Sequence, residues 1–83
     1  MTKVVLSKIA QKRLEHLPKS EQEKVKKRMM ALRENPLAGK KLSGKLTDYR
    51  SVRAWPYKII YFINEKINRV EIVDVTHRQG AYR

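Results

Sequence analysis

Residues that could bind or cleave a phosphodiester gather in the second half of the chain, which holds all six aromatic residues and most of the arginines. The segment Asp48–Trp55 predicts a strand. Its two-residue period places Tyr49, Ser51, Arg53 and Trp55 on one face, and Arg50, Val52 and Ala54 on the other. Lys58 follows in the next predicted strand, on the face opposite Tyr57. Arginines can clamp phosphates and aromatic rings can stack on bases, so this pattern indicates a surface for single-stranded nucleic acid.

The C-terminal segment adds His77, Arg78 and Tyr82 directly after a predicted strand. An imidazole titrates near neutral pH, a guanidinium can neutralise a phosphorane, and a tyrosine can stack or donate a hydrogen bond. Together these groups could cleave RNA without a metal, by attack of the 2′-hydroxyl on the adjacent phosphate. From the residues alone, simple binding of nucleic acid or of an acidic partner is favoured over cleavage.

Other chemistries find no support in the sequence. There is no cysteine, and the two histidines, His16 and His77, are far apart, so we expect no metal site and no cofactor. Gly39 and Gly44 form no phosphate-binding loop pattern, and no serine lies in a nucleophile elbow or triad motif. Paired carboxylates for hydrolysis are not indicated, because the acidic residues among the strands are few and surrounded by arginine.

Length and charge restrict the class of protein. The chain has 83 residues with a formal net charge of +12, and 41% of its residues are hydrophobic. We expect one folded domain, residues 1–83, in the cytoplasm, with no membrane span or secretory signal. The excess of positive charge favours a polyanionic partner, either nucleic acid or an acidic protein.

The first half of the chain predicts a strand followed by a helical hairpin. Lys3–Leu6 is short and β-branched. Ser7 can cap a helix that carries an apolar stripe (Ala10, Leu14, Leu17) and ends at Pro18. Ser20 and Glu23 form a capping-box pattern for a second helix, whose stripe is Val25, Met29 and Leu32 and which Asn35-Pro36 stops. Lys24, Lys27 and Arg28 lie on another face of this helix.

The second half predicts a loop and an antiparallel sheet. The loop is Leu37–Lys45, the strands are Asp48–Trp55, Tyr57–Asn64 and Arg69–Val75, and the tail is Thr76–Arg83; Pro56 marks a break and Glu65–Asn68 a turn. The resulting order is β-α-α-β-β-β. We therefore expect an α+β fold in which two helices pack on one face of a mostly antiparallel sheet.

Five segments, in this order, resemble the bacterial and archaeal RelE/ParE toxin superfamily. They are Leu42-Ser43-Gly44, Tyr49-Arg50-Ser51-Val52-Arg53, Tyr57-Lys58-Ile59-Ile60-Tyr61, Val73-Asp74-Val75-Thr76-His77-Arg78 and Tyr82-Arg83. The resemblance implies a toxin of a type II toxin–antitoxin pair, neutralised by an acidic antitoxin. It also implies, for the RelE-like branch, an endoribonuclease that cuts messenger RNA at the ribosome and so inhibits translation.

The resemblance also implies roles for particular residues. Arg53, Lys58 and Arg78 match cationic positions that hold the scissile phosphate, Lys58 standing where the family usually has arginine. His77 matches the residue before the C-terminal arginine and is the expected proton-transfer group, and Tyr82 matches the tyrosine that stacks on the substrate base. Arg50, Lys45 and Arg83 are the expected additional RNA-binding residues. The alternatives are a ParE-like toxin that poisons DNA gyrase and has no nuclease activity, or an inactive module that binds nucleic acid or antitoxin.

Overall fold

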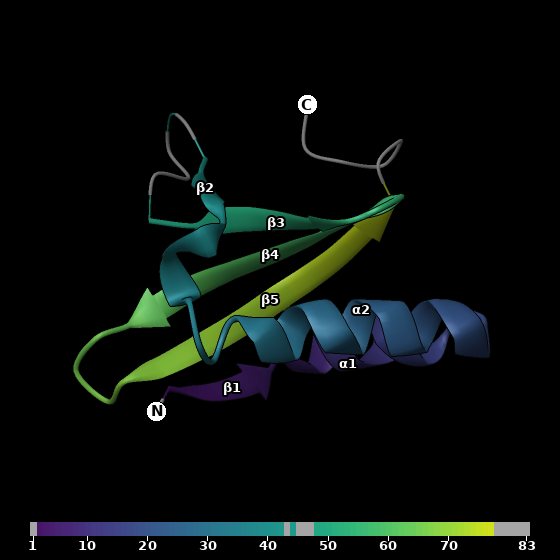
Figure 1. Cartoon of the computed structure of the whole chain (residues 1–83), viewed down its shortest axis with the longest axis horizontal. Helices are drawn as coiled ribbons and strands as arrows, with labels where there is room; N and C mark the ends of the chain where they lie inside the picture. The colour runs from purple at the N-terminus through teal and green to yellow at the C-terminus, as the bar shows by residue number, and fades with distance from the viewer. Residues whose placement is uncertain (1, 43, 45–47, 78–83) are drawn as a thin grey trace.

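The computed structural model describes residues 2–42, 44 and 48–77. In chain order its elements are β1 (Lys3–Leu6), α1 (Lys8–Glu15), α2 (Lys19–Ala31), the short 3₁₀ helix η1 (Pro36–Ala38), β2 (Lys40–Lys41), β3 (Arg50–Ala54), β4 (Tyr57–Asn64) and β5 (Arg69–His77) (Figure 1). No helix in this part of the chain is long and apolar enough to cross a membrane.

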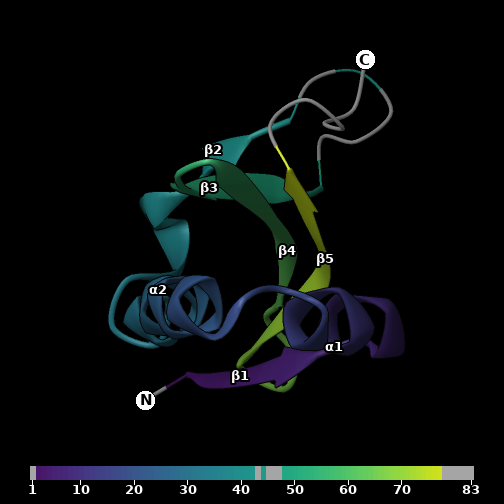
Figure 2. The same cartoon turned by 90° about the vertical axis from the view of Figure 1, so that its right-hand side faces the viewer.

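One mixed sheet contains all five strands, in the order β1-β5-β4-β3-β2. The strands from β2 to β5 are antiparallel to their neighbours, whereas β1 lies parallel to β5 at the opposite edge. Figure 2 shows α1 and α2 running side by side, with the strands arching away from them toward β2 and β3. The expected α+β fold, two helices packed on a mostly antiparallel sheet, is confirmed.

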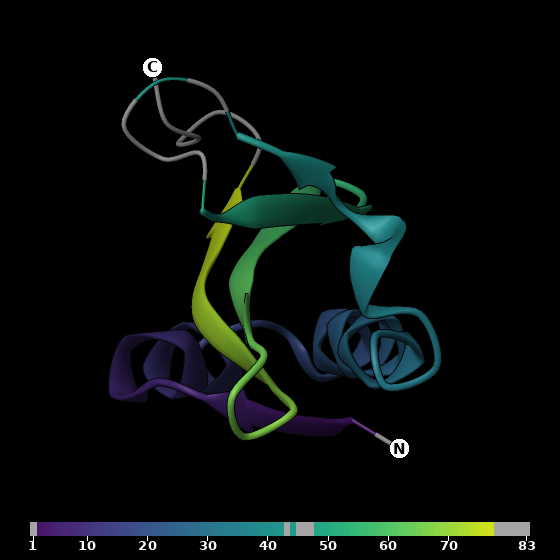
Figure 3. The same cartoon turned by 90° about the vertical axis from the view of Figure 1, so that its left-hand side faces the viewer.

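The core lies between the helices and one face of the sheet. From the two predicted stripes, Ala10, Leu14, Val25, Met29 and Leu32 are buried in this core, whereas Leu17, which follows the end of α1 at Glu15, is partly buried and packs against it. The strand members of the core include Val52, Ala54, Ile59, Tyr61, Val70, Ile72 and Val75. Figure 3 shows the same arrangement from the other side, with β2 and β3 farthest from β1. The opposite face of β3 and β4 carries no helix and is called the open face below.

Ser7 begins α1 as the sequence predicts. Its Oγ accepts a hydrogen bond from the Ala10 backbone N–H at 3.1 Å, and the same hydroxyl donates to the Val73 carbonyl at 2.9 Å. The β4–β5 register shifts here, because Ile60 pairs with Asp74 and the next residue, Tyr61, pairs with Ile72. One hydroxyl therefore caps the helix and satisfies a carbonyl at an irregular position of β5.

The predicted start of the second helix is wrong. Helix α2 begins at Lys19 with Pro18 as its N-cap, and no side chain caps it. Its first turn is closed by a hydrogen bond from Gln22 N–H to the Pro18 carbonyl at 2.9 Å. The φ of proline already matches helical geometry, so Pro18 can precede the first turn without a side-chain cap. Ser20 therefore lies inside α2, whereas the capping box would require it to be an extended residue in front of the helix.

Three predicted segments in the second half also differ. The strand expected over Asp48–Trp55 is shorter at both ends, since β3 is Arg50–Ala54. The expected loop Leu37–Lys45 contains the end of η1 and the edge strand β2, and β5 continues through Thr76 and His77, which were expected in the tail. The last two differences follow from strand pairing. Lys40 pairs with Ser51, and Thr76 and His77 pair with the first two residues of β4. Such pairing extends a strand beyond the apolar residues that mark it in the sequence.

Candidate functional site

A hollow of about 520 Å³ lies at the β2–β3 edge of the sheet. Five cationic residues line it: Arg28 from α2, Lys40 and Lys41 from β2, Arg53 from β3 and Lys58 from β4. The other lining residues are Ala38, Leu42, Ser51 and Val52. None of these nine residues is acidic. We call this feature the basic hollow, and its concentrated positive charge creates a potential that attracts anions.

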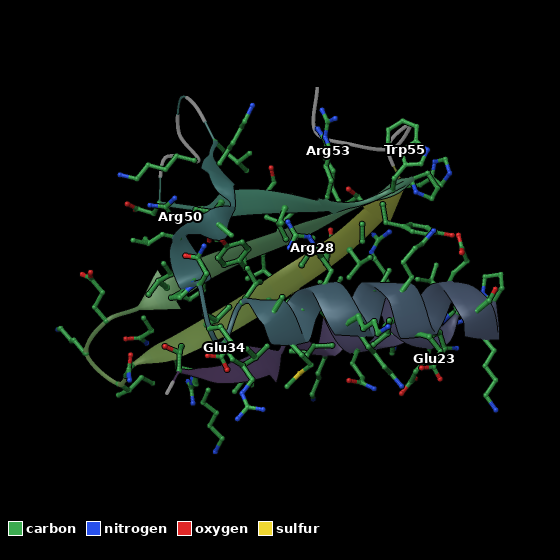
Figure 4. All side chains as sticks on the ribbon, in the orientation of Figure 1. Glu23, Arg28, Glu34, Arg50, Arg53 and Trp55 are labelled. Carbon is green, nitrogen blue, oxygen red and sulfur yellow. The ribbon has the colours of Figure 1, made fainter. Side chains whose placement is uncertain are left out.

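Arg53 and Lys58 are direct neighbours across β3 and β4. Both lie on the open face, because Val52 and Ile59, the next pair in the ladder, are buried against the helices. Directly opposed residues have Cβ atoms about 4.5–5.5 Å apart, and like charges at such positions destabilise a sheet. A bound anion would remove that repulsion. Figure 4 shows Arg53 pointing away from the helices.

Arg28 reaches the basic hollow from the opposite side of β3. Its Nε donates to the Arg53 carbonyl at 3.1 Å, on the edge of β3 that β2 leaves uncovered because it pairs only with Arg50 and Ser51. In Figure 4 its side chain rises from α2 toward the strands. The sequence reasoning missed this residue, since it placed Arg28 on a solvated lysine-rich face. The sequence does contain a signal for this position. Arg28 lies three residues after the buried Val25, so it borders the apolar stripe of α2 that faces the sheet.

Lys40 and Lys41 were also missed, because they lie in a segment expected to be a loop. Tyr61 holds this segment against the sheet: its hydroxyl donates to the Pro36 carbonyl at 2.7 Å and accepts from Gly39 N–H at 2.9 Å. A Cβ at Gly39 would lie 2.6 Å from that hydroxyl oxygen, so the close approach requires glycine. The fully buried Tyr61 therefore sets the position of the two lysines that follow Gly39.

The phenol of Tyr61 stays protonated at neutral pH. Burial raises its pKa above the ordinary value of 10.0, and the hydrogen bond from Gly39 and the positive charges of Arg50 and Arg28 oppose this shift only in part. Tyr61 is therefore a structural donor and not a general base.

The predicted RNA-binding residue Arg50 lies on the helix-covered face of β3, since it pairs with the buried Tyr61. Its Nη1 donates to the Gly39 carbonyl at 2.8 Å, so it braces the same segment that Tyr61 holds. Arg50 thus supports the wall of the basic hollow from the side opposite Arg53. Lys45 and Arg83, the other two predicted RNA-binding residues, lie outside the residues that the structure describes.

His77 lies apart from Arg53 and Lys58. It pairs with Tyr57 on the helix-covered side of the sheet, and the two rings meet edge to face with centroids 5.6 Å apart. Its neighbour Thr76 pairs instead with Lys58. His77 lines a second hollow, also of about 520 Å³, together with residues of α1 and with His16 and Leu17, which follow that helix. Arg78 and Tyr82 lie outside the described residues. Of the five predicted catalytic residues, the structure therefore brings Arg53 and Lys58 together.

The described residues offer no cluster of three or more histidine, cysteine, aspartate or glutamate side chains that could hold a metal ion. The groups available in the basic hollow are ammonium and guanidinium cations. They can bind a phosphate and stabilise negative charge that develops on it.

Comparisons with known proteins agree with this fold. The model of the ParE toxin family of type II toxin–antitoxin systems (parDE) matches residues 4–82. None of the curated proteins matches the chain in sequence.

Solved structures of similar proteins include toxin–antitoxin complexes. The RelBE2 complex of Mycobacterium tuberculosis is similar at a TM-score of 0.86 and 29% identity, over 93% of this chain and 98% of that one. The archaeal RelE–RelB complex of Pyrococcus horikoshii is similar at a TM-score of 0.78 and 25% sequence identity, over 96% of this chain and 98% of that one. The isolated RelE toxin of E. coli shares the fold at a TM-score of 0.79 and 22% sequence identity, over 100% of this chain and 87% of that one. The chain therefore belongs to the RelE/ParE superfamily and is a toxin of a type II toxin–antitoxin system.

Proposed function

We propose that this toxin is a metal-independent endoribonuclease that cuts messenger RNA at the ribosome, in the cytoplasm, and thereby stops translation. The observation that carries the proposal is the opposed pair Arg53 and Lys58 in a hollow that also holds Arg28 and lacks acidic lining residues. Three cations from three different elements converge there, which is the requirement for binding a phosphodiester whose charge grows during reaction.

The proposed reaction is a transesterification within the RNA. The 2′-hydroxyl oxygen forms a bond to the adjacent phosphorus, the bond to the 5′-oxygen breaks, and the products are a 2′,3′-cyclic phosphate and a free 5′-hydroxyl. A proton leaves the 2′-oxygen and another reaches the departing 5′-oxygen, so no oxidant or co-substrate is needed. Arg53 and Lys58 would neutralise the phosphorane between these steps, while Arg28, Lys40 and Lys41 would bind the flanking backbone.

Three further roles rest on the resemblance to RelE-like toxins. Arg78 is proposed as a third phosphate ligand and Tyr82 as a residue that stacks on the substrate base. His77 stays a prediction as the proton-transfer group. Because its ring packs on Tyr57 on the helix-covered side, His77→Ala is a separate test of that role.

The proposed partner in the inactive state is an acidic antitoxin. The net charge of +12 provides long-range attraction for such a protein, and two of the similar structures are complexes of a RelE toxin with its antitoxin. The second candidate function is poisoning of DNA gyrase. It is favoured by the description of the matching family model, which names ParE.

Mapping of cellular mRNA ends by primer extension after brief induction separates the two candidates. The wild type is compared with Arg53→Ala and with Lys66→Ala, a control that removes one charge from the exposed β4–β5 turn. We expect codon-phased cuts for the wild type and the control, and a loss of roughly 10²–10³-fold for Arg53→Ala, the usual cost of removing one group that stabilises the transition state. Growth arrest without cuts would favour gyrase, and undiminished cutting by Arg53→Ala would refute the assigned site.

A further inference from the structure

Trp55 is a large aromatic residue that the fold leaves 57% exposed. It is the only tryptophan of the chain and directly follows β3. The buried apolar residues of β3, Val52 and Ala54, belong to the face that packs against the helices. An indole that is exposed to this extent presents a flat apolar surface to solvent, on which another ring can stack.

Trp55 lies close in sequence to a residue of the basic hollow. It is two residues beyond Arg53, in the turn that directly follows β3. Figure 4 shows both side chains on the side of β3 that faces away from the helices. In an extended single strand the phosphates and the bases point in different directions. A cation can therefore bind the phosphate of one nucleotide while a neighbouring aromatic ring stacks on a base of the same strand.

We propose that Trp55 is a base-stacking platform for single-stranded RNA, which holds the base next to the phosphate bound by Arg53 and Lys58. The proposal rests on the proposed function of the basic hollow as an RNA site. The charge of the surroundings favours RNA over a protein as the occupant. Five cations line the adjacent hollow and no acidic residue does, which suits a ligand with a regular series of phosphates.

The platform has a consequence for sequence preference. Stacking strength grows with the area of the base, so a purine on Trp55 is expected to bind more tightly than a pyrimidine. The cations of the hollow contact phosphates, which are the same in every nucleotide, and therefore contribute no preference. Removing the indole should thus weaken binding and abolish the purine preference together.

Because Trp55 is the only tryptophan, its fluorescence reports the contact directly. The free toxin is titrated with short 2′-O-methyl oligonucleotides of adenosine or uridine, whose blocked 2′-oxygens prevent cleavage. Inorganic tripolyphosphate is the matched probe, since it occupies the cations and has no base. We expect the adenosine oligonucleotide to quench the fluorescence, the uridine oligonucleotide to quench it at higher concentration, and tripolyphosphate to leave it unchanged.

Affinities measured by anisotropy of a labelled oligonucleotide complete the test. Trp55→Ala is expected to bind the adenosine oligonucleotide roughly 5- to 100-fold more weakly, the effect of losing one base–aromatic stack, and Trp55→Phe to retain part of the affinity. Ile67→Ala is the matched control, because it removes another exposed apolar side chain, 54% exposed, in the β4–β5 turn. Circular dichroism checks that each variant is folded.

The outcomes separate the platform from the hollow. The first outcome is that the oligonucleotide binds, that Arg53→Ala lowers its affinity, and that the fluorescence of Trp55 is not quenched. In that case the platform is refuted and the RNA site stands. If wild type and Arg53→Ala both fail to bind, or bind equally, the RNA site itself is refuted and the platform with it. If Trp55→Ala weakens binding of the antitoxin and leaves RNA affinity unchanged, Trp55 is a protein contact and the proposal is wrong.

Discussion

Replacing Tyr61 by phenylalanine tests whether one buried hydroxyl holds the β2 wall of the basic hollow in place. The substitution removes the acceptor of Gly39 N–H and the donor to the Pro36 carbonyl, two hydrogen bonds of 2.9 and 2.7 Å. The ring itself, which is fully buried, can stay where it is. The experiment therefore changes polar contacts and leaves the hydrophobic packing nearly intact.

The magnitude follows from the burial of the two groups. A buried N–H left without an acceptor costs about 1–3 kcal/mol, and the half-buried carbonyl that loses its donor costs about 0.5–1.5 kcal/mol. We expect the free energy of unfolding to fall by about 1.5–4.5 kcal/mol in total. A domain of this size has roughly 4–12 kcal/mol of stability, and each kcal/mol lost lowers the melting temperature by about 4–8 °C, so the melting temperature should fall by roughly 6–36 °C.

Urea unfolding followed by circular dichroism measures this change, with the midpoint falling and the slope unchanged. Hydrogen exchange of the Gly39 amide adds a local readout, because its protection should fall more than that of core amides in β4. Tyr57→Phe, which removes a hydroxyl from a half-buried tyrosine, is the control. A Tyr61→Phe protein within about 0.5 kcal/mol of wild type, with Gly39 still protected, would show that the hydroxyl does not hold the segment.

Two further predictions concern stability. Ser7→Ala removes the cap of α1 and the donor to the Val73 carbonyl. The free energy of unfolding, measured by thermal denaturation, should therefore fall by about 1–2 kcal/mol. An unchanged melting curve would contradict the role of this hydroxyl. Burial raises the pKa of Tyr61 above 10.0, so this group leaves stability independent of pH below pH 10. Above that pH the unfolded chain loses the proton first and stability declines. The decline should be smaller in Tyr61→Phe, and equal alkaline slopes would refute the cause.

Much of the fold could be predicted because local periodicity expresses which residues are buried. The strands Lys3–Leu6 and Tyr57–Asn64 have the predicted bounds, and the stripes of both helices lie in the core. The alternation of β3 also holds, with Val52 buried and Arg53 exposed. The two-residue period of a strand and the 3.6-residue period of a helix are properties of the backbone, so apolar spacing reveals them without knowledge of neighbouring elements.

The start of α2 and the strand β2 could not be predicted in this way. Lys40 and Lys41 have no apolar pattern, and they form a strand because Ser51 and Arg50 offer a free edge and Tyr61 ties down the preceding residues. Pro18 takes the place of the predicted Ser20 cap, because its φ already suits the first turn of a helix. The strand β2 therefore depends on contacts between distant segments, whereas the start of α2 depends on the backbone conformation of one residue.

The sequence by itself determined the sign and the size of the protein's net charge. Twenty basic residues against eight acidic ones, with arginines and aromatic residues in the second half, indicate a polyanion whatever the detailed fold. It also determined that Arg53 lies on the opposite face of its strand from Val52. Only the tertiary structure decided which cations meet: it brings Arg28 to the edge of β3, uses Arg50 as a brace, and puts His77 beside Tyr57. The physical reason is that net charge is a sum over residues and the period of a strand or helix is a local property of the backbone. Strand pairing and helix packing, in contrast, join residues that are far apart in sequence.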